Sequence, residues 1–123
     1  MSEPTRGTSR SWPCPHPADF AILVVHTRAD VVLQLSGALT YEGSDAFDKC
    51  VEWVLADAPR RLVLEASALL ALDRSGVASF FKASRRAETA SVELVLDSPN
   101  ELVSTLLEAA GIRDAFVVRP RAR

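Results

Sequence analysis

Hydrophobic residues along this chain fall into two periods, one typical of strands and one typical of amphipathic helices. Residues 20–25 and 31–35 are short runs rich in Val, Ile and Leu, and the polar residues between them predict a β-hairpin. Residues 62–64, 92–96 and 115–118 predict three further strands. The run at 62–64 is continuously apolar, as in a strand covered on both faces, and a loop is expected after it.

After the hairpin, hydrophobic side chains recur at spacings of three and four residues, which predicts amphipathic helices. The first helix is expected over residues 44–58, with Ser44 or Asp45 as its N-cap and Pro59 as its stop. The second is expected from about residue 75 to residue 88.

A third helix has the clearest start signal in the chain. Ser98 is expected to cap it, Pro99 to occupy its first position and Glu101 to complete a capping box. Gly111 is expected just beyond its last turn, where a left-handed residue ends many helices.

The order of these elements predicts one α/β domain, a mixed β-sheet of four to five strands with helices packed against it. A chain of 123 residues is long enough for one such core. The side chains expected to be buried include Leu64, Val77, Phe80, Phe81, Val95 and Leu106.

The two ends differ in composition from the middle of the chain. Residues 1–18 contain four prolines among Ser, Thr and Arg, which predicts a flexible arm that folding does not need. The domain itself is expected over 19–118, followed by a basic tail over 119–123. Trp12 is the exception within the arm, since an indole there either packs back on the domain or marks a partner contact.

Charge argues against a nucleic-acid-binding surface. The chain has a formal net charge of −2, but residues 19–118 carry more acidic than basic side chains, whereas the tail adds Arg119, Arg121 and Arg123. Binding to nucleic acid depends on neutralising phosphates, which an acidic body opposes. The tail is therefore expected to be solvated, with anion binding as its alternative role.

Cysteine and histidine are too sparse for a structural metal site or a disulfide framework. Cys50 falls on the apolar stripe of the first predicted helix and is expected to be a small core residue, without a redox role. Cys14 and His16 are a weak metal signal in the proline-rich segment, and no metal site is predicted.

No signal in the chain predicts contact with a membrane. No apolar run approaches the length of a membrane span, and the first residues lack the apolar stretch of a secretory signal. A cytoplasmic location is therefore expected.

The most informative segment joins the third predicted strand to the second helix. It contains Asp73, Arg74, Ser75 and Gly76. Asp73 can cap the helix through its carboxylate, Ser75 can bond free amides, and Gly76 allows another backbone to approach closely. Free amides and the helix dipole at such a turn suit docking or phosphorylation.

Catalysis has no comparable support in the sequence. The chain has no glycine-rich phosphate loop with Lys, no histidine pair at metal spacing and no nucleophile elbow. A triad of Ser75, His26 and Asp73 is not favoured by spacing, because Asp73 lies too close to Ser75 to orient a histidine for it. No catalytic residue and no cofactor are predicted.

Residues 62–77 resemble, without a gap, the signature of STAS domains, the fold of bacterial anti-sigma factor antagonists. In that pattern an apolar strand leads through Asp-Ser-Ser/Thr-Gly-Leu into a helix. Residues 37–40, Gly-Ala-Leu-Thr, are similar to the family's Gly-Glu-Leu-Asp turn, with Thr40 at the position of the Asp. The resemblance extends over about residues 19–118 and includes the order of the elements.

This resemblance implies a non-enzymatic module that docks on a kinase-like anti-sigma factor and thereby releases a sigma factor. The partner-binding or regulatory residues that it implies are Asp73, Arg74, Ser75, Gly76 and Thr40. In the family the serine directly after the Asp accepts the phosphoryl group, and Arg74 stands there in this chain. The usual phosphoserine switch is therefore not expected, and Ser75, whose other role would be helix capping, is the possible phosphoacceptor.

Two other functions stay open at this point. STAS subunits also serve as accessory parts of membrane transport ATPase complexes, which would give a different protein partner. A small-molecule or nucleotide sensor could use the same helix N-terminus as an anion site.

Overall fold

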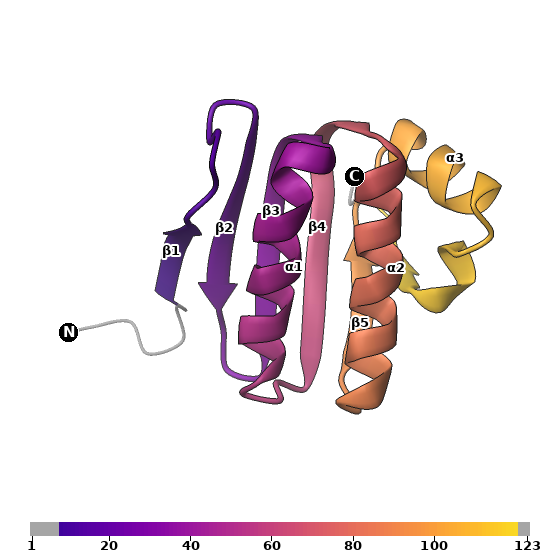
Figure 1. Ribbon diagram of the computed structural model, residues 1–123. Coiled ribbons are helices and arrows are strands. Elements are labelled where there is room, and N and C mark those ends of the chain that lie inside the picture. The colour runs from indigo at the N-terminus through magenta and orange to yellow at the C-terminus, as the bar shows by residue number, and fades with distance from the viewer. Residues whose placement is uncertain (1–7, 121–123) are drawn as a thin grey trace.

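A computed structural model describes residues 8–120, which form a sheet with helices layered on it (Figure 1). The strands are β1 (Thr8–Trp12), β2 (Phe20–His26), β3 (Asp30–Leu39), β4 (Arg61–Leu72), β5 (Glu93–Asp97) and β6 (Val117–Arg119). The helices are α1 (Tyr41–Leu55), α2 (Arg74–Thr89) and α3 (Glu101–Ala109), followed by a short 3-10 turn, η1 (Arg113–Ala115). The predicted α/β fold is confirmed, with six strands within the described residues instead of four to five.

The strands lie side by side in the order in which they occur in the chain. β1, β2 and β3 pair antiparallel, whereas β3, β4, β5 and β6 are parallel. Each parallel step therefore needs a crossover helix, and crossovers are nearly always right-handed. Because the sheet grows in one direction, this rule places the crossover helices on one face, where Figure 1 shows α1 and α2 in front of the sheet.

The core lies between this helical layer and the sheet. Leu33, Leu64 and Leu96 are paired neighbours on β3, β4 and β5, and all three are fully buried. The Phe47 ring of α1 stacks on the Phe80 ring of α2 with a centroid distance of 5.6 Å. The predicted burial of Leu64, Phe80 and Val95 is confirmed.

The opposite face of the sheet carries a row of valines, one from each of five neighbouring strands. Each valine is the register partner of the next one across the sheet, in the order Val25, Val32, Val63, Val95 and Val117. The two in the middle, Val63 and Val95, are buried, and Val117 on β6 is half exposed. The continuous apolar run at 62–64 therefore has the two-sided burial that its sequence predicts.

Helix α1 begins earlier than the sequence predicts. Its N-cap is Thr40, so the expected caps Ser44 and Asp45 lie inside its first turns. The Ser44 hydroxyl donates to the Tyr41 carbonyl at 3.0 Å instead of capping free amides. The helix ends at Leu55, ahead of Pro59.

Helix α3 has a different cap from the one predicted, and one of its expected core residues is less buried than expected. Asn100, not Ser98, is its N-cap, and its Oδ1 accepts from the Val103 amide at 2.9 Å. Leu107 is fully buried, while the expected core residue Leu106 is only half-buried. Gly111 has a φ of +75°, which confirms the predicted helix end.

Two further predictions are wrong, one of a buried side chain and one of a loop. Phe81 on α2 is 41% exposed, because the buried face of this helix is centred on Phe80 and Ala83. Residues 66–71, predicted as a loop, continue β4, since the long strand β3 offers pairing partners as far as Leu72.

The expectation of an unstructured arm is wrong for its described part. Residues 8–12 form β1, which pairs antiparallel with β2. The Trp12 ring packs on Trp53 of α1 with a centroid distance of 5.4 Å, so Trp12 packs back on the domain. The domain therefore begins before residue 19.

The remaining parts of the arm and of the tail, residues 1–7 and 121–123, lie outside the described residues. Of the tail arginines, Arg119 lies in the described part, where it ends β6 and forms an ion pair with Asp97 at 3.4 Å. No helix of the described part is long and apolar enough to cross a membrane.

Candidate functional site

Asp73 is the N-cap of α2 and also bonds the first turn of α1. Its Oδ1 accepts a hydrogen bond from the Gly76 amide at 2.9 Å. Its Oδ2 accepts from the Tyr41 amide at 3.0 Å. The first amides of a helix have no partner within the helix, and a carboxylate there also meets the positive end of the helix dipole. One side chain therefore satisfies a free amide on each of two helices.

The sheet topology explains why these helix starts meet. α1 follows β3 and α2 follows β4, and the two strands are parallel neighbours whose carboxyl ends reach the same edge of the sheet. The Asp73 amide also donates to the Leu39 carbonyl at 3.3 Å, which places Asp73 beside Thr40. Figure 1 shows both strand-to-helix connections at the upper end of the domain.

Gly76 lies where the two connections touch. A Cβ atom at this position would clash with the backbone carbonyl oxygen of Leu39 and with the Leu72 side chain. The predicted role of Gly76, close approach of another backbone, is therefore what the geometry requires.

Arg74 and Ser75 occupy the first turn of α2. Arg74 is exposed, and the ion pairs found within residues 8–120 do not include it. A cation at a helix N-terminus is unfavourable by up to about 1 kcal/mol, so the fold gains nothing from this guanidinium. Ser75 is half-buried, and its predicted capping role is wrong because Asp73 caps the helix.

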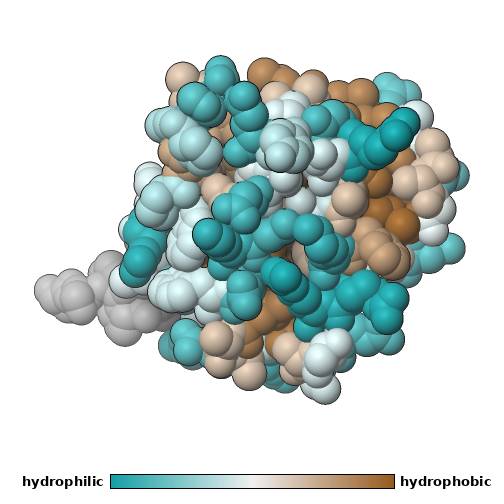
Figure 2. Space-filling model, viewed as in Figure 1, coloured by the Kyte–Doolittle hydropathy of each residue, from teal (hydrophilic) through white to brown (hydrophobic). Residues whose placement is uncertain are grey.

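Two large apolar side chains beside this turn are strongly exposed. Tyr41, which follows Thr40, is 77% exposed, and Leu70, near the end of β4, is 75% exposed. In Figure 2 hydrophobic residues reach the surface at the upper and lower ends and along the right side of the helical face, while much of its middle is hydrophilic. Sequence reasoning missed both residues, although the alternation of β4 already directs Leu70 away from the buried Leu69.

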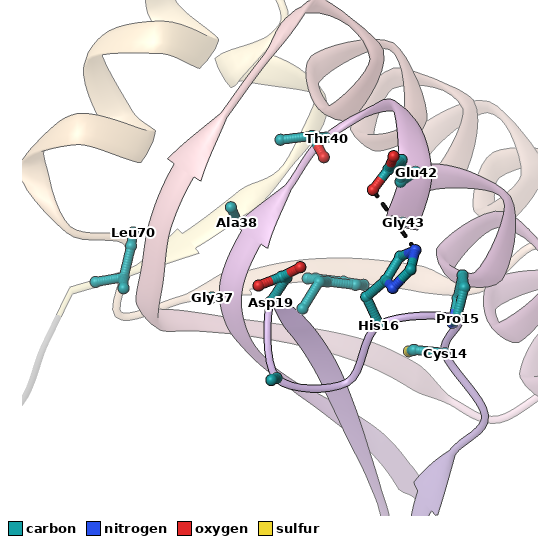
Figure 3. Close-up of a pocket in the computed structure, with 12 residues that line it drawn as sticks. Cys14, Pro15, His16, Asp19, Gly37, Ala38, Thr40, Glu42, Gly43 and Leu70 are labelled. Carbon is teal, nitrogen blue, oxygen red and sulfur yellow. Dashed lines mark ion pairs between the residues drawn. The ribbon is translucent and has the colours of Figure 1, made fainter.

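A cavity of about 380 Å³ opens beside Thr40 (Figure 3). The segment between β1 and β2 forms one wall with His16 and Asp19, and the start of α1 contributes Glu42. His16 Nε2 lies 3.7 Å from Glu42 Oε1, and both side chains are largely exposed. The sequence assigned the His16 part of this wall to a flexible arm, so the cavity could not be predicted.

The remaining candidate groupings are not brought together. His26 lies at the far end of β2, where its ring faces Trp53 at a centroid distance of 6.2 Å, away from Asp73 and Ser75. Cys14 and His16 both line the cavity, but no cluster of three metal-binding side chains occurs within residues 8–120.

Comparison with known protein families decides the classification. The sequence pattern of the family described as "Mlab, STAS domain" matches residues 22–119, which is most of the chain. The chain belongs to the STAS domain family. No curated protein sequence matches it closely enough to count as a relative.

Solved structures share this STAS fold at low sequence identity. An anti-sigma factor antagonist from Mycobacterium paratuberculosis is 19% identical with a TM-score of 0.75, over 85% of this chain and 88% of that one. The Bacillus cell fate determinant SpoIIAA in its phosphorylated form is 19% identical with a TM-score of 0.65, over 80% and 90% of the two chains. The murine anion transporter Slc26a9 is 17% identical with a TM-score of 0.64, over 94% of this chain but only 21% of the transporter.

Within this STAS domain, all five residues that the sequence singled out lie at one edge. Asp73, Gly76 and Thr40 build the junction between the strands and the helices. Arg74 and Ser75 begin the helix that leads away from it. Tyr41, Leu70 and the cavity wall are additions to this set that come from the three-dimensional arrangement.

Proposed function

We propose that this STAS domain is a non-enzymatic antagonist of an anti-sigma factor. It docks through the edge around Asp73 on an anti-sigma factor with a kinase-like ATP-binding fold and thereby releases a sigma factor. The observation that carries the proposal is an edge where Arg74, Tyr41 and Leu70 are exposed beside the junction that Asp73 and Gly76 build. The near full-length match to an anti-sigma factor antagonist supports the same reading.

The exposed side chains at this edge suit binding better than folding. Tyrosine and arginine are enriched among the residues that dominate binding energy at protein interfaces. Tyr41 and Leu70 would lose most of their exposed apolar surface to a partner. Arg74 would give a charge-assisted hydrogen bond to a carboxylate of the partner.

The usual phosphorylation switch does not fit this chain. A guanidinium cannot accept a phosphoryl group, and Arg74 occupies the position where the family has its phosphoacceptor serine. Ser75 is the remaining hydroxyl of the turn and is half-buried in the first turn of α2. We therefore propose constitutive binding, with Ser75 as the place of any modification.

The binding test compares two arginines on the same domain. The partner is first captured from native lysate by the tagged protein and identified by mass spectrometry, and its affinity is then measured by calorimetry. Arg74→Ala is expected to weaken binding by about 1–3 kcal/mol through loss of a charge-assisted contact. Arg28→Ala, an exposed arginine in the β2–β3 turn at the other end of the domain, is the matched control and should bind normally. Equal affinities for both variants would refute a role for Arg74.

The regulatory test is direct. The protein is incubated with the captured anti-sigma factor and ATP, and its intact mass is followed over time. Little or no phosphate should be added, and any slow addition should disappear in Ser75→Ala. Rapid, stoichiometric phosphorylation would contradict the absence of the switch.

A second candidate function is an accessory STAS subunit of a membrane transport ATPase. The observation that favours a place in a membrane transport system is the same fold inside the Slc26a9 anion transporter. The capture experiment separates the two functions, because this alternative would return a transport ATPase instead of an anti-sigma factor.

A further inference from the structure

The segment that leads from β1 toward β2 runs alongside helix α1. Where the segment leaves β1, the guanidinium of Arg10 in that strand lies 4.9 Å from the centre of the Trp53 ring. Trp12 packs on the same Trp53 ring at 5.4 Å. At its other end, His16 reaches Glu42 near the start of α1, at 3.7 Å. The segment and the helix therefore run in opposite directions, and the segment contacts the helix at both ends.

Cys14 lies between these contacts on the segment, and Cys50 lies between them on α1. Cys14 follows Trp12 by two residues, and Cys50 precedes Trp53 by nearly one helical turn, on the buried face of α1. Cys14 packs against the hydrophobic core to which Cys50 belongs, and it also lines the cavity shown in Figure 3. Both cysteines are free thiols.

The ionisation of the two thiols agrees with this proximity. Burial, together with the charge of the neighbouring Cys14 thiolate, raises the pKa of Cys50 to about 12. Burial also raises the pKa of Cys14, and this effect is larger than that of a hydrogen bond from the Ile22 backbone, which lowers the pKa. Both residues are therefore protonated and slow to react at neutral pH.

We propose that Cys14 and Cys50 form an intramolecular disulfide when the protein meets a low-molecular-weight disulfide such as oxidised glutathione. The Cys14 thiolate, which faces the cavity, attacks one sulfur of the oxidant, and one external thiol leaves. The Cys50 thiol then attacks the Cys14 sulfur and passes its proton to the departing external sulfur, which leaves as the second external thiol. Two protein thiols are oxidised, and one external disulfide is reduced to two thiols.

The disulfide would fasten the segment before β2 to α1 and hold the cavity wall beside Thr40. It would close a loop from residue 14 to residue 50, which removes conformational freedom mainly from the unfolded chain. The oxidised form is therefore more stable than the reduced form. This inference does not depend on the proposed function, since it concerns the domain alone.

The first test measures how strongly the folded state favours the disulfide. The purified protein is equilibrated with mixtures of reduced and oxidised glutathione at mildly alkaline pH, trapped with acid and analysed by intact mass. Formation of the disulfide removes the mass of two hydrogen atoms. The folded protein should form it in glutathione mixtures at least about tenfold more reducing than those in which the protein unfolded in concentrated urea forms it. The proposal would be overturned if the folded protein needed an equally oxidising or more oxidising glutathione mixture than the unfolded protein to form the disulfide.

The second test uses thermal unfolding and a cysteine variant. The oxidised protein should melt about 5 °C or more above the reduced protein, because the cross-link restricts the unfolded chain. Cys14→Ser leaves the buried Cys50 in place and should show neither the mass loss nor the rise in Tm. Stable glutathione adducts, disulfide-linked dimers or an unchanged Tm after oxidation would each refute the intramolecular bond.

Discussion

At the scale of single residues, Asp73 is the side chain that forms hydrogen bonds with the starts of two helices. Its two carboxylate oxygens accept from amides 32 residues and three residues away along the chain. The bond to Gly76 is local and could be predicted from the sequence, because an aspartate three residues before an amide is a common capping arrangement. The bond to Tyr41 could not be predicted, since it depends on the register between β3 and β4.

Replacing Asp73 with alanine removes both hydrogen bonds. The free energy of unfolding should fall by about 1–2 kcal/mol, because water can reach the two amides and compensate in part. Urea unfolding measures this change. Asp57→Ala is the matched control, since Asp57 is an exposed carboxylate for which no hydrogen bond or ion pair is found within residues 8–120. A loss no larger than that of the control would show that the junction is held by other contacts.

At the scale of elements, the sequence predicts the existence of helices better than their first residues. Ser98 and Asn100 are both good N-cap residues, and local pattern alone does not choose between them. A tertiary contact favours Asn100, because its Nδ2 also donates to the Leu69 carbonyl of β4 at 2.6 Å. This choice starts α3 later, and within the helix Leu107 is buried more deeply than Leu106.

A pair of leucine variants tests the buried face of α3. Leu107→Ala should lower the free energy of unfolding by about 2–5 kcal/mol, as expected for a fully buried leucine. Leu106→Ala should cost less than about 2 kcal/mol, because its side chain is only half-buried and leaves a smaller cavity. Chemical denaturation of both variants provides the comparison. A larger loss for Leu106→Ala would mean that Leu106, and not Leu107, lies on the buried face of α3.

At the scale of the whole molecule, the sheet is wider than the sequence predicts, because β1 carries no hydrophobic alternation. Its residues Thr8 to Trp12 are mostly polar and precede a proline-rich stretch, a composition typical of flexible segments. The strand is held instead by backbone pairing with β2 and by the packing of Trp12 on Trp53. Such contacts depend on partners distant in the sequence, so they leave no periodic signal.

The boundary of the domain can be tested with two truncations. Deleting residues 1–7 keeps every described residue and serves as the control. Deleting residues 1–17 removes β1, exposes the edge of β2 and removes Trp12 from its contact with Trp53, a residue that is already 39% exposed. Five paired residues and a packed indole are lost, so the longer truncation should lower the free energy of unfolding by at least about 2 kcal/mol relative to the control. The Tm should fall with it, and equal urea midpoints for the two truncations would mean that β1 contributes nothing to the stability of this fold.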